Sequence, residues 1–450
     1  MTDSRCYPRV LVVDALPFCR HFNNGIVKSS WFQGWPKEAL AQIVYSNVQP
    51  GFDVCERYWV LRKTDILLGA VGMGGGGRPL VRPGALNETV FDPAAAYAYE
   101  ARPRIERILS HLSNTIRTPL GEAILRLPAA NSPALKNWLR SFKPQVVFTM
   151  GGLGPILRLA AKIAQAEQIP LIPYFTDDWV NCIYPTGLFH SSLRRSFERW
   201  FRRCLDLSTV RMTASDAMAR EYKQRYFGKF EAFLNLTEQF DTTPEPERAC
   251  VRFSFIGALS PNRWEPLCLI GRALLKLRER GIAGELVVYS FPEDLRRFGK
   301  HFEGCAAIVT GGTVAPSEVR GLQLDSNILV HAESFDGATR VLTKFSLSAK
   351  VPQYMMAGRC VLAVGPADAA SICYVAESGA GVAVSLEDEA VLCAELERLI
   401  TDSALRQRYA SRARQTAVTR HDAAAARERF RVLVSEVNAE WVERSTCRGK

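Results

Sequence analysis

The sequence predicts an α/β protein with two parallel-sheet domains. Short apolar runs of strand length alternate with amphipathic stretches of helical length along most of the chain. The alternation occurs in two sets, and the polar, Pro-rich segment 242–249 separates them. The 450 residues are 47% hydrophobic and 23% charged, which is ordinary globular usage in a chain long enough for two domains. Strands that alternate with helices form parallel sheets with helices on both faces.

The first set of elements runs to about residue 226. Strands are predicted at residues 10–13, 40–45, 145–150, 171–175 and 207–213. Helices are predicted at residues 25–32, 155–165, 193–205 and 216–226. Pro155 stands at the first position of its helix, and Ser215 is placed to cap the next one. The Gly- and Pro-rich segment at about 70–100 is predicted to be a long, mobile loop.

The second set begins at about residue 251. Strands are predicted at residues 251–256, 286–289, 307–310, 328–331, 361–364 and 381–384. Helices are predicted at residues 265–280 and 351–357, and one long helix rich in Ala and Arg at 422–437. The predicted organisation is a first domain at 1–241, a linker at 242–249, a second domain at 250–421 and a terminal helical segment at 422–450.

The charge balance indicates an anionic partner. The chain carries 57 basic and 46 acidic side chains, a net charge of +11, and residues 1–150 alone hold 18 basic and 11 acidic ones. Nucleic acid, a membrane surface and phosphorylated ligands all fit such an excess. Nucleic acid is the least favoured of the three, because no recognised binding module surrounds the basic residues.

Other compositional signals exclude several classes of protein. The 12 Cys form no CxxC pair and no cluster with zinc spacing, so we expect reduced thiols, a cytoplasmic protein and no metal site. No run of ~18 apolar residues predicts a membrane span, and the N-terminus does not resemble a signal peptide. The GxGxxG pattern at 72–77 precedes Arg78 and Pro79, which cannot begin the helix that a dinucleotide site needs.

Two short motifs in the first half follow predicted strands. Asn24 and Gly25 lie at the start of a helix, where Gly allows a ligand to approach the backbone, although turns also use Gly for conformational reasons alone. Asp177 and Asp178 end a strand on the side where such sheets bind ligands. Adjacent carboxylates on an extended chain point to opposite faces, so one is expected to cap the next element and the other to contact substrate.

A basic helix is predicted at 193–205. Its apolar residues fall on one face, and the opposite face carries five arginines: Arg194, Arg195, Arg199, Arg202 and Arg203. One interpretation is a helix lying on an anionic membrane surface, and the other is a core-facing helix with a solvated arginine face.

The stretch 344–358 is the most informative. Ser348 and Lys350 begin a helix whose free N–H groups are suited to an anion such as a diphosphate. Gly358 ends the helix, and an apolar strand follows.

Five stretches together resemble the GT-B glycosyltransferases of the family 4-like group, in a branch used in polysaccharide synthesis. KVPQYMMAGRCVLAVGP at 350–366 resembles the family's K-x-P-E-Y-x-A-x-G segment, and SICYVAESGAGVAV at 371–384 is similar to the segment that follows it. FIGALSPNRW at 255–264 resembles the start of the donor domain, and TASDAMAREY at 213–222 the end of the acceptor domain. Asn24 and Gly25, followed by GWPKE at 34–38, resemble the opening of the branch.

The resemblance implies two Rossmann-like domains that face each other, with the acceptor on the first domain and the nucleotide sugar on the second. It also implies a C-terminal helix that crosses back to the first domain. The implied reaction is metal-independent and retaining, with no cofactor beyond a UDP-, GDP- or TDP-sugar donor. Cations and helix N-termini would then stabilise the departing diphosphate.

The resemblance assigns site residues by position. On the donor side they are Gly257, Arg263, Ser348, Lys350 and Gln353, with Asn24 and Gly25 approaching the diphosphate from the acceptor domain. Gln353 replaces the Glu that holds the ribose in the family, and Ala258 replaces an Arg. Asp177 occupies the place of a common acceptor-side His, and with Asp178 it is the catalytic candidate.

The sequence therefore predicts a glycosyltransferase acting on a cell-surface glycan or lipid-linked precursor, with the arginine helix on the anionic inner leaflet. One alternative is a nucleotide-sugar epimerase of the same fold, which would need His around its cleft, whereas the chain has only six His. The other is a non-catalytic binding or scaffold protein, which the replacements at Gln353 and Ala258 favour.

Overall fold

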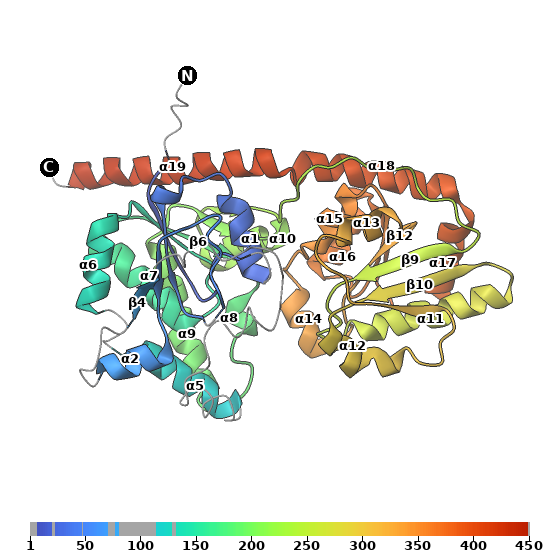
Figure 1. Ribbon diagram of the computed structural model, residues 1–450, viewed down its shortest axis with the longest axis horizontal. Coiled ribbons are helices and arrows are strands. Elements are labelled where there is room, and N and C mark those ends of the chain that lie inside the picture. The colour runs from blue at the N-terminus through green and yellow to red at the C-terminus, as the bar shows by residue number, and fades with distance from the viewer. Residues whose placement is uncertain are drawn as a thin grey trace, which may run out of the picture. The chain divides into compact units, whose positions relative to one another are not determined.

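The computed structural model describes residues 7–19, 23–46, 48–70, 77–80, 114–127 and 132–448 (Figure 1). Two compact units make up the chain. Unit 1 comprises residues 1–233 together with 427–450, and unit 2 comprises residues 234–426. Most of the predicted loop at about 70–100 lies outside the described residues. Within it, residues 78–80 form a strand, so no helix follows Gly77 and the dinucleotide interpretation of GxGxxG is excluded.

Unit 1 is built on an eight-stranded sheet with the order β4-β3-β2-β1-β5-β6-β7-β8. The strands are β1 (Val10–Asp14), β2 (Leu40–Val44), β3 (Tyr58–Val60), β4 (Arg78–Leu80), β5 (Val146–Thr149), β6 (Leu171–Phe175), β7 (Arg211–Thr213) and β8 (Phe230–Ala232). Neighbouring strands are parallel except at the edge, where β4 runs antiparallel to β3. Central strands such as β1 are buried throughout, which explains their unbroken apolar sequences.

Helices cover the sheet of unit 1 (Figure 1). They are α1 (Asn23–Phe32), α2 (Lys63–Ala70), α5 (Asn114–Leu125), α6 (Pro133–Phe142), α7 (Gly154–Glu167), α8 (Trp179–Cys182), α9 (His190–Asp206) and α10 (Asp216–Tyr226). A short 3-10 turn occupies Lys37–Ala39. Ser215 caps α10 as predicted, because its hydroxyl accepts a hydrogen bond from the Met218 backbone N–H.

The end of the chain belongs to unit 1. Helix α19 (Ala423–Arg448) places the Phe430 ring against the rings of Phe32, at 5.0 Å, and Phe148, at 5.8 Å. Arg427 Nε also donates to the Ser30 carbonyl at 2.8 Å. Burial of an aromatic side chain is worth several kcal/mol, which explains why this helix is bound to the first half of the sequence.

Unit 2 is built on a six-stranded, fully parallel sheet with the order β11-β10-β9-β12-β13-β14. Its strands are β9 (Val251–Ile256), β10 (Gly284–Tyr289), β11 (Ile308–Gly312), β12 (Ile328–Ala332), β13 (Cys360–Val364) and β14 (Gly381–Val384). Its helices are α11 (Trp264–Glu279), α12 (Pro292–Phe298), α13 (Val319–Leu324), α14 (Gly337–Thr343), α15 (Lys350–Met356), α16 (Ala370–Ser378), α17 (Glu389–Thr401) and α18 (Ser403–Arg420), with a 3-10 turn at Gly299–His301.

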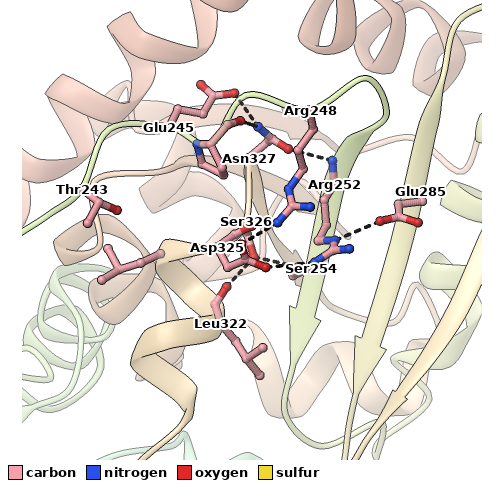
Figure 2. A network of polar contacts seen from close by, with 12 residues as sticks. Thr243, Glu245, Arg248, Arg252, Ser254, Glu285, Leu322, Asp325, Ser326 and Asn327 are labelled. Carbon is pink, nitrogen blue, oxygen red and sulfur yellow. Dashed lines mark hydrogen bonds and ion pairs between the residues drawn. The ribbon is translucent and has the colours of Figure 1, made fainter.

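Part of the predicted linker is bound to the body of unit 2. Figure 2 shows Asn327 reaching Glu245, and its amide donates to Glu245 Oε1 at 2.9 Å and to the Pro246 carbonyl at 2.8 Å. In the same network Arg252 contacts Glu285 and Asp325, at 2.9 Å each (Figure 2). These polar contacts fix the segment at the amino ends of β9 and β12, so it does not behave as a free connection.

The strand order marks where ligands bind in each sheet. In unit 1 the chain order reverses between β1 and β5, and in unit 2 it reverses between β9 and β12. Open α/β sheets bind ligands in the crevice at the carboxyl ends of the two strands that flank such a reversal. In unit 2 these ends carry Gly257 and Glu333.

Candidate functional site

The carboxyl end of β9 brings two predicted residues together. Gly257 follows the strand with a φ of 143°, and the Lys350 side chain occupies the space where a Cβ of residue 257 would lie. Only Gly fits both the backbone conformation and this close approach. Lys350 Nζ lies 4.5 Å from the centroid of the Phe255 ring, so the ammonium rests on the face of an aromatic side chain.

The surroundings of Lys350 change its ionisation. Burial of the ammonium lowers the pKa of Lys350 to about 7, and the positive charge of Arg263 acts in the same direction. The carboxylates of Glu333 and Asp294 offset only part of this effect. At neutral pH, Lys350 is therefore divided between its charged and neutral forms, and a bound anion would favour the charged one.

Arg263, which immediately precedes α11, is held in one orientation. Its Nε lies 3.1 Å from Glu333 Oε2, its Nη2 lies 3.3 Å from Glu333 Oε1, and its Nη1 donates to the Ser260 carbonyl at 2.7 Å. Three of the five guanidinium N–H groups are used in this way. The remaining two have no hydrogen-bond partner among the described residues and can donate to a ligand.

Glu333 is the residue at this site that sequence reasoning missed. It is 2% exposed, and His331 Nε2 lies 3.2 Å from its Oε1. Burial would raise the pKa of Glu333, but the His331 contact and the charge of Arg263 outweigh it and hold this pKa below its usual value. Burial lowers the pKa of His331. Glu333 and Ser334 directly follow the buried strand β12. This was a signal present in the sequence, because the residues that follow the strands at this edge of the sheet line the crevice.

Ser348 and Gln353 lie near Lys350 but have different environments. Ser348 N–H donates to Ser371 Oγ at 2.9 Å, and Ser348 Oγ accepts from Lys350 N–H at a long 3.4 Å. Gln353 is exposed, and in the described part of the chain its side chain makes no hydrogen bond. Helix α15 has only seven residues, so the cationic side chains are the main anion-binding groups here.

In unit 1, Gly25 is explained by packing. A Cβ at residue 25 would overlap Cys19 Sγ and the Pro17 carbonyl, so Gly allows α1 to approach the loop that follows β1. The same loop is fixed by Lys28, which is fully buried and contacts Asp14 Oδ2. Asn24 is half-buried beside Gly25. The structure therefore gives Gly25 a role that needs no ligand.

The structure corrects the prediction for Asp178. Asp178 is 3% exposed, and its carboxylate accepts hydrogen bonds from Tyr222 Oη at 2.9 Å, Arg225 Nη1 at 2.9 Å and Asn181 Nδ2 at 2.7 Å. Both oxygens are thus engaged inside unit 1, so this residue is structural, and its side chain does not cap α8. Asp177 is half-buried and accepts from Thr176 Oγ1 at 2.8 Å.

A second buried carboxylate near this edge was also missed. Glu122 of α5 is 5% exposed and accepts a hydrogen bond from Tyr184 Oη. It lies against Gly154, the first residue of α7, where a negative charge favours the helix N-terminus. Burial raises the pKa of Glu122. An internal carboxylate therefore already occupies this helix end.

The five arginines of α9 have different partners. Arg194 Nη2 donates to the Val180 carbonyl at 3.3 Å, Arg202 pairs with Glu198 at 2.8 Å, and Arg203 lies 3.9 Å from Asp206. Arg195 and Arg199 are exposed, and no acidic partner contacts them within the described residues.

The described residues contain neither a metal-binding cluster nor a membrane-spanning helix. No group of three or more His, Cys, Asp or Glu side chains there is arranged to hold a metal ion. No helix there combines the length and apolar composition needed to cross a bilayer.

Comparison with known proteins identifies the fold. No family model matches the sequence, and no curated protein matches it either. Among solved structures, Anabaena HepE in complex with UDP is similar, with a TM-score of 0.61 and 10% identity over 95% of this chain and 100% of that one. Sucrose-phosphate synthase from Thermosynechococcus elongatus has a TM-score of 0.62 and 12% identity over 96% of this chain and 100% of the other.

WaaG, a glycosyltransferase involved in lipopolysaccharide biosynthesis, is a third similar structure. It has a TM-score of 0.56 and 12% identity, and the match covers 94% of this chain and 99% of that one. This protein has the GT-B fold. At identities of 10–12% the likeness concerns the fold alone.

Proposed function

We propose that the protein is a glycosyltransferase that moves a sugar from a nucleotide-sugar donor to a glycan or lipid-linked acceptor in cell-surface polysaccharide biosynthesis. The observation that carries the proposal is the pair of cations, Arg263 and Lys350, at the crevice where the sheet of unit 2 reverses its strand order. The GT-B neighbours support it, and HepE has been solved with UDP.

The donor diphosphate would lie against Arg263 and Lys350. Its negative charge increases as the bond to the sugar breaks, so fixed cations stabilise the transition state more than the ground state. Glu333 and the Ser260 carbonyl orient the guanidinium before substrate arrives, which reduces the cost of reorganisation. A phosphate beside Lys350 would also restore the proton that burial removes.

The finer features of the reaction are part of the same proposal. Gln353, exposed on α15, would hydrogen-bond the ribose in place of the family's Glu. Because Arg263 and Lys350 supply positive charge at the leaving group, the proposed step requires no metal ion. Asp177 is retained as the acceptor-side candidate, and the retaining outcome rests on the family resemblance alone.

A non-catalytic binding protein with this fold is the second candidate. Gln353 and Ala258 favour it, because they replace a Glu and an Arg that the family uses. The engagement of Asp178 within unit 1 also removes one acid from the candidate active site.

Calorimetry with UDP, GDP and TDP, followed by transfer and hydrolysis assays with the corresponding sugars, tests both candidates. The glycosyltransferase proposal predicts binding of at least one nucleotide, loss of that binding in Arg263→Gln, and turnover of its sugar. Binding without turnover of any donor would support the binding protein. Absence of nucleotide binding would contradict both.

A lipid-linked acceptor would bring the protein to the inner face of the plasma membrane. We therefore propose a cytoplasmic protein that associates peripherally with that membrane, and the contacts of α9 indicate which residues would do so.

A further inference from the structure

Helix α9 presents two distinct surfaces. Its apolar side chains Leu193, Phe197 and Phe201 are 8%, 1% and 0% exposed and form part of the core of unit 1. The helix therefore cannot insert its apolar face into a bilayer, as an interfacial amphipathic helix does. The predicted membrane interpretation is corrected on this point: only the arginine side of α9 is available to a partner.

Positive charge exceeds negative charge on that side, because Glu198 and Asp206 pair with Arg202 and Arg203 alone. Arg195 and Arg199 lie one turn apart, are exposed, and have no acidic partner in the described ranges. Arg158 of the neighbouring helix α7 adds a third guanidinium. The Arg158 and Arg199 guanidinium carbons each lie 5.9 Å from the centroid of the Trp200 ring, so the two cations converge on one indole.

Convergence of like charges has an electrostatic cost. Burial lowers the pKa of Arg158, and the charges of Arg126 and Arg199 lower it further. The one hydrogen bond described for Arg158 goes to the Arg126 carbonyl, at 3.1 Å, which supplies no net negative charge. An external anion at this position would reduce the repulsion.

The surface between α7 and α9 is hollowed. A depression of about 670 Å³ extends along α9 from Arg195 to Asp206 and includes Trp200 and Gln165 of α7. It is lined by four arginines, against the two acids Glu198 and Asp206. This hollow can admit compact anionic groups such as lipid phosphates.

Two large apolar side chains are exposed immediately before α9. Leu188 is 52% exposed and Phe189 is 70% exposed, and Phe189 has a left-handed φ of 61°. Leucine and phenylalanine next to a basic helix are typical of surfaces that enter the headgroup region of a membrane, whereas duplex nucleic acid is bound mainly through its phosphates.

We propose that Leu188, Phe189, Arg158, Arg195 and Arg199 form a docking surface for a bilayer that contains anionic phospholipids. The arginines contact lipid phosphates, and the two apolar side chains enter the headgroup region while α9 remains packed on unit 1. The proposal rests on the proposed function, because a lipid-linked acceptor explains why the protein would meet a membrane. It adds anionic membrane lipid as a partner.

The test measures sedimentation of the full-length protein with vesicles of phosphatidylcholine, with or without phosphatidylglycerol. Each arginine near an anionic surface contributes about fivefold to the partition coefficient, so the double variant Arg195→Gln/Arg199→Gln is expected to bind about 25-fold less. Arg408→Gln/Arg412→Gln, a pair of exposed arginines one turn apart on α18, is the matched control and should bind as the wild type does. Leu188→Ser/Phe189→Ser should also weaken binding.

UDP binding and the thermal midpoint are measured on every variant, so loss of the fold or failure of the proposed function is seen separately from loss of membrane binding. The proposal is overturned if the α9 variant sediments like the wild type, or if the α18 control loses binding equally. It is also overturned if wild-type protein ignores anionic vesicles but binds duplex DNA through the same arginines. Unchanged binding of the Leu188→Ser/Phe189→Ser variant would remove these two residues from the docking surface.

Discussion

Raising the pH above neutrality is expected to weaken nucleotide binding through Lys350. In the free protein, burial and the nearby charge of Arg263 lower the pKa of Lys350 to about 7, against an ordinary value of 10.5. A diphosphate beside the ammonium would stabilise the charged form and raise this pKa again. Above pH 7 the free protein has therefore lost a proton that the complex needs, and binding must be accompanied by proton uptake.

The magnitude follows from this linkage. Binding of a ligand that requires the protonated amine weakens by up to tenfold for each pH unit above the free pKa, until the pKa of the complex is reached. Between pH 7 and pH 9 the Kd is then expected to rise about 50-fold. The nucleotide does not contribute to this slope, because its terminal phosphate, with a pKa of about 6, is already ionised.

Calorimetric titration with UDP at several pH values, in buffers of different ionisation enthalpy, measures both the Kd and the proton uptake. Lys350→Arg is the control, because its guanidinium stays charged and its Kd should change little from pH 7 to 9. A wild-type Kd that is constant over this range would refute the reasoning. So would a slope that persists in the arginine variant.

Three further substitutions test particular packing arguments. Gly257→Ala should abolish binding of the nucleotide that the wild type binds, and it should lower the free energy of unfolding by about 1–3 kcal/mol, because residue 257 has φ 143° and faces Lys350. Gly337→Ala, in open space, should bind normally. Asp178→Asn should cost about 1–3 kcal/mol in chemical denaturation, because it removes the buried charge that pairs with Arg225 while Glu221 remains as a partner of Arg225, and a cost near zero would contradict the structural role. Phe430→Ala should destabilise unit 1 by about 3–5 kcal/mol, and hydrogen exchange that is unchanged in unit 1 would show that α19 does not contribute to its core.

Strands and caps were the features most accessible to sequence reasoning. Buried strands such as β1 and β12 are continuous apolar runs, and Ser215 caps α10 with a local hydrogen bond to Met218. Short edge strands gave no such signal: β4 contains Pro79 and is largely exposed, so it resembled a loop. Helices α5 and α6 were not predicted. Pro119 lies inside α5 and obscures it, whereas α6 did carry a signal, because Ser132 caps it, Pro133 begins it and its apolar residues fall at helical spacing.

Three of the predicted donor-side residues lie close together in the structure. Gly257, Arg263 and Lys350 lie together at the carboxyl end of β9, because parallel strands bring separate loops to one edge of a sheet. Asp178 was assigned to chemistry because its position at a strand end is also where catalytic groups lie. Its partner Arg225 is 47 residues away, and nothing in the local sequence reveals that contact.

The sequence by itself determined the alternation of strands and helices, the division into two sets, the excess of positive charge and the motifs that resemble GT-B enzymes. These are periodic or local properties, and they can be read without knowing which segments meet. Only the tertiary structure decided that Glu333 orients Arg263, that Asp178 is buried within an ion pair, and that the apolar face of α9 belongs to the core. Each of these depends on burial and on partners far apart in the chain, and both exist only once the chain has folded.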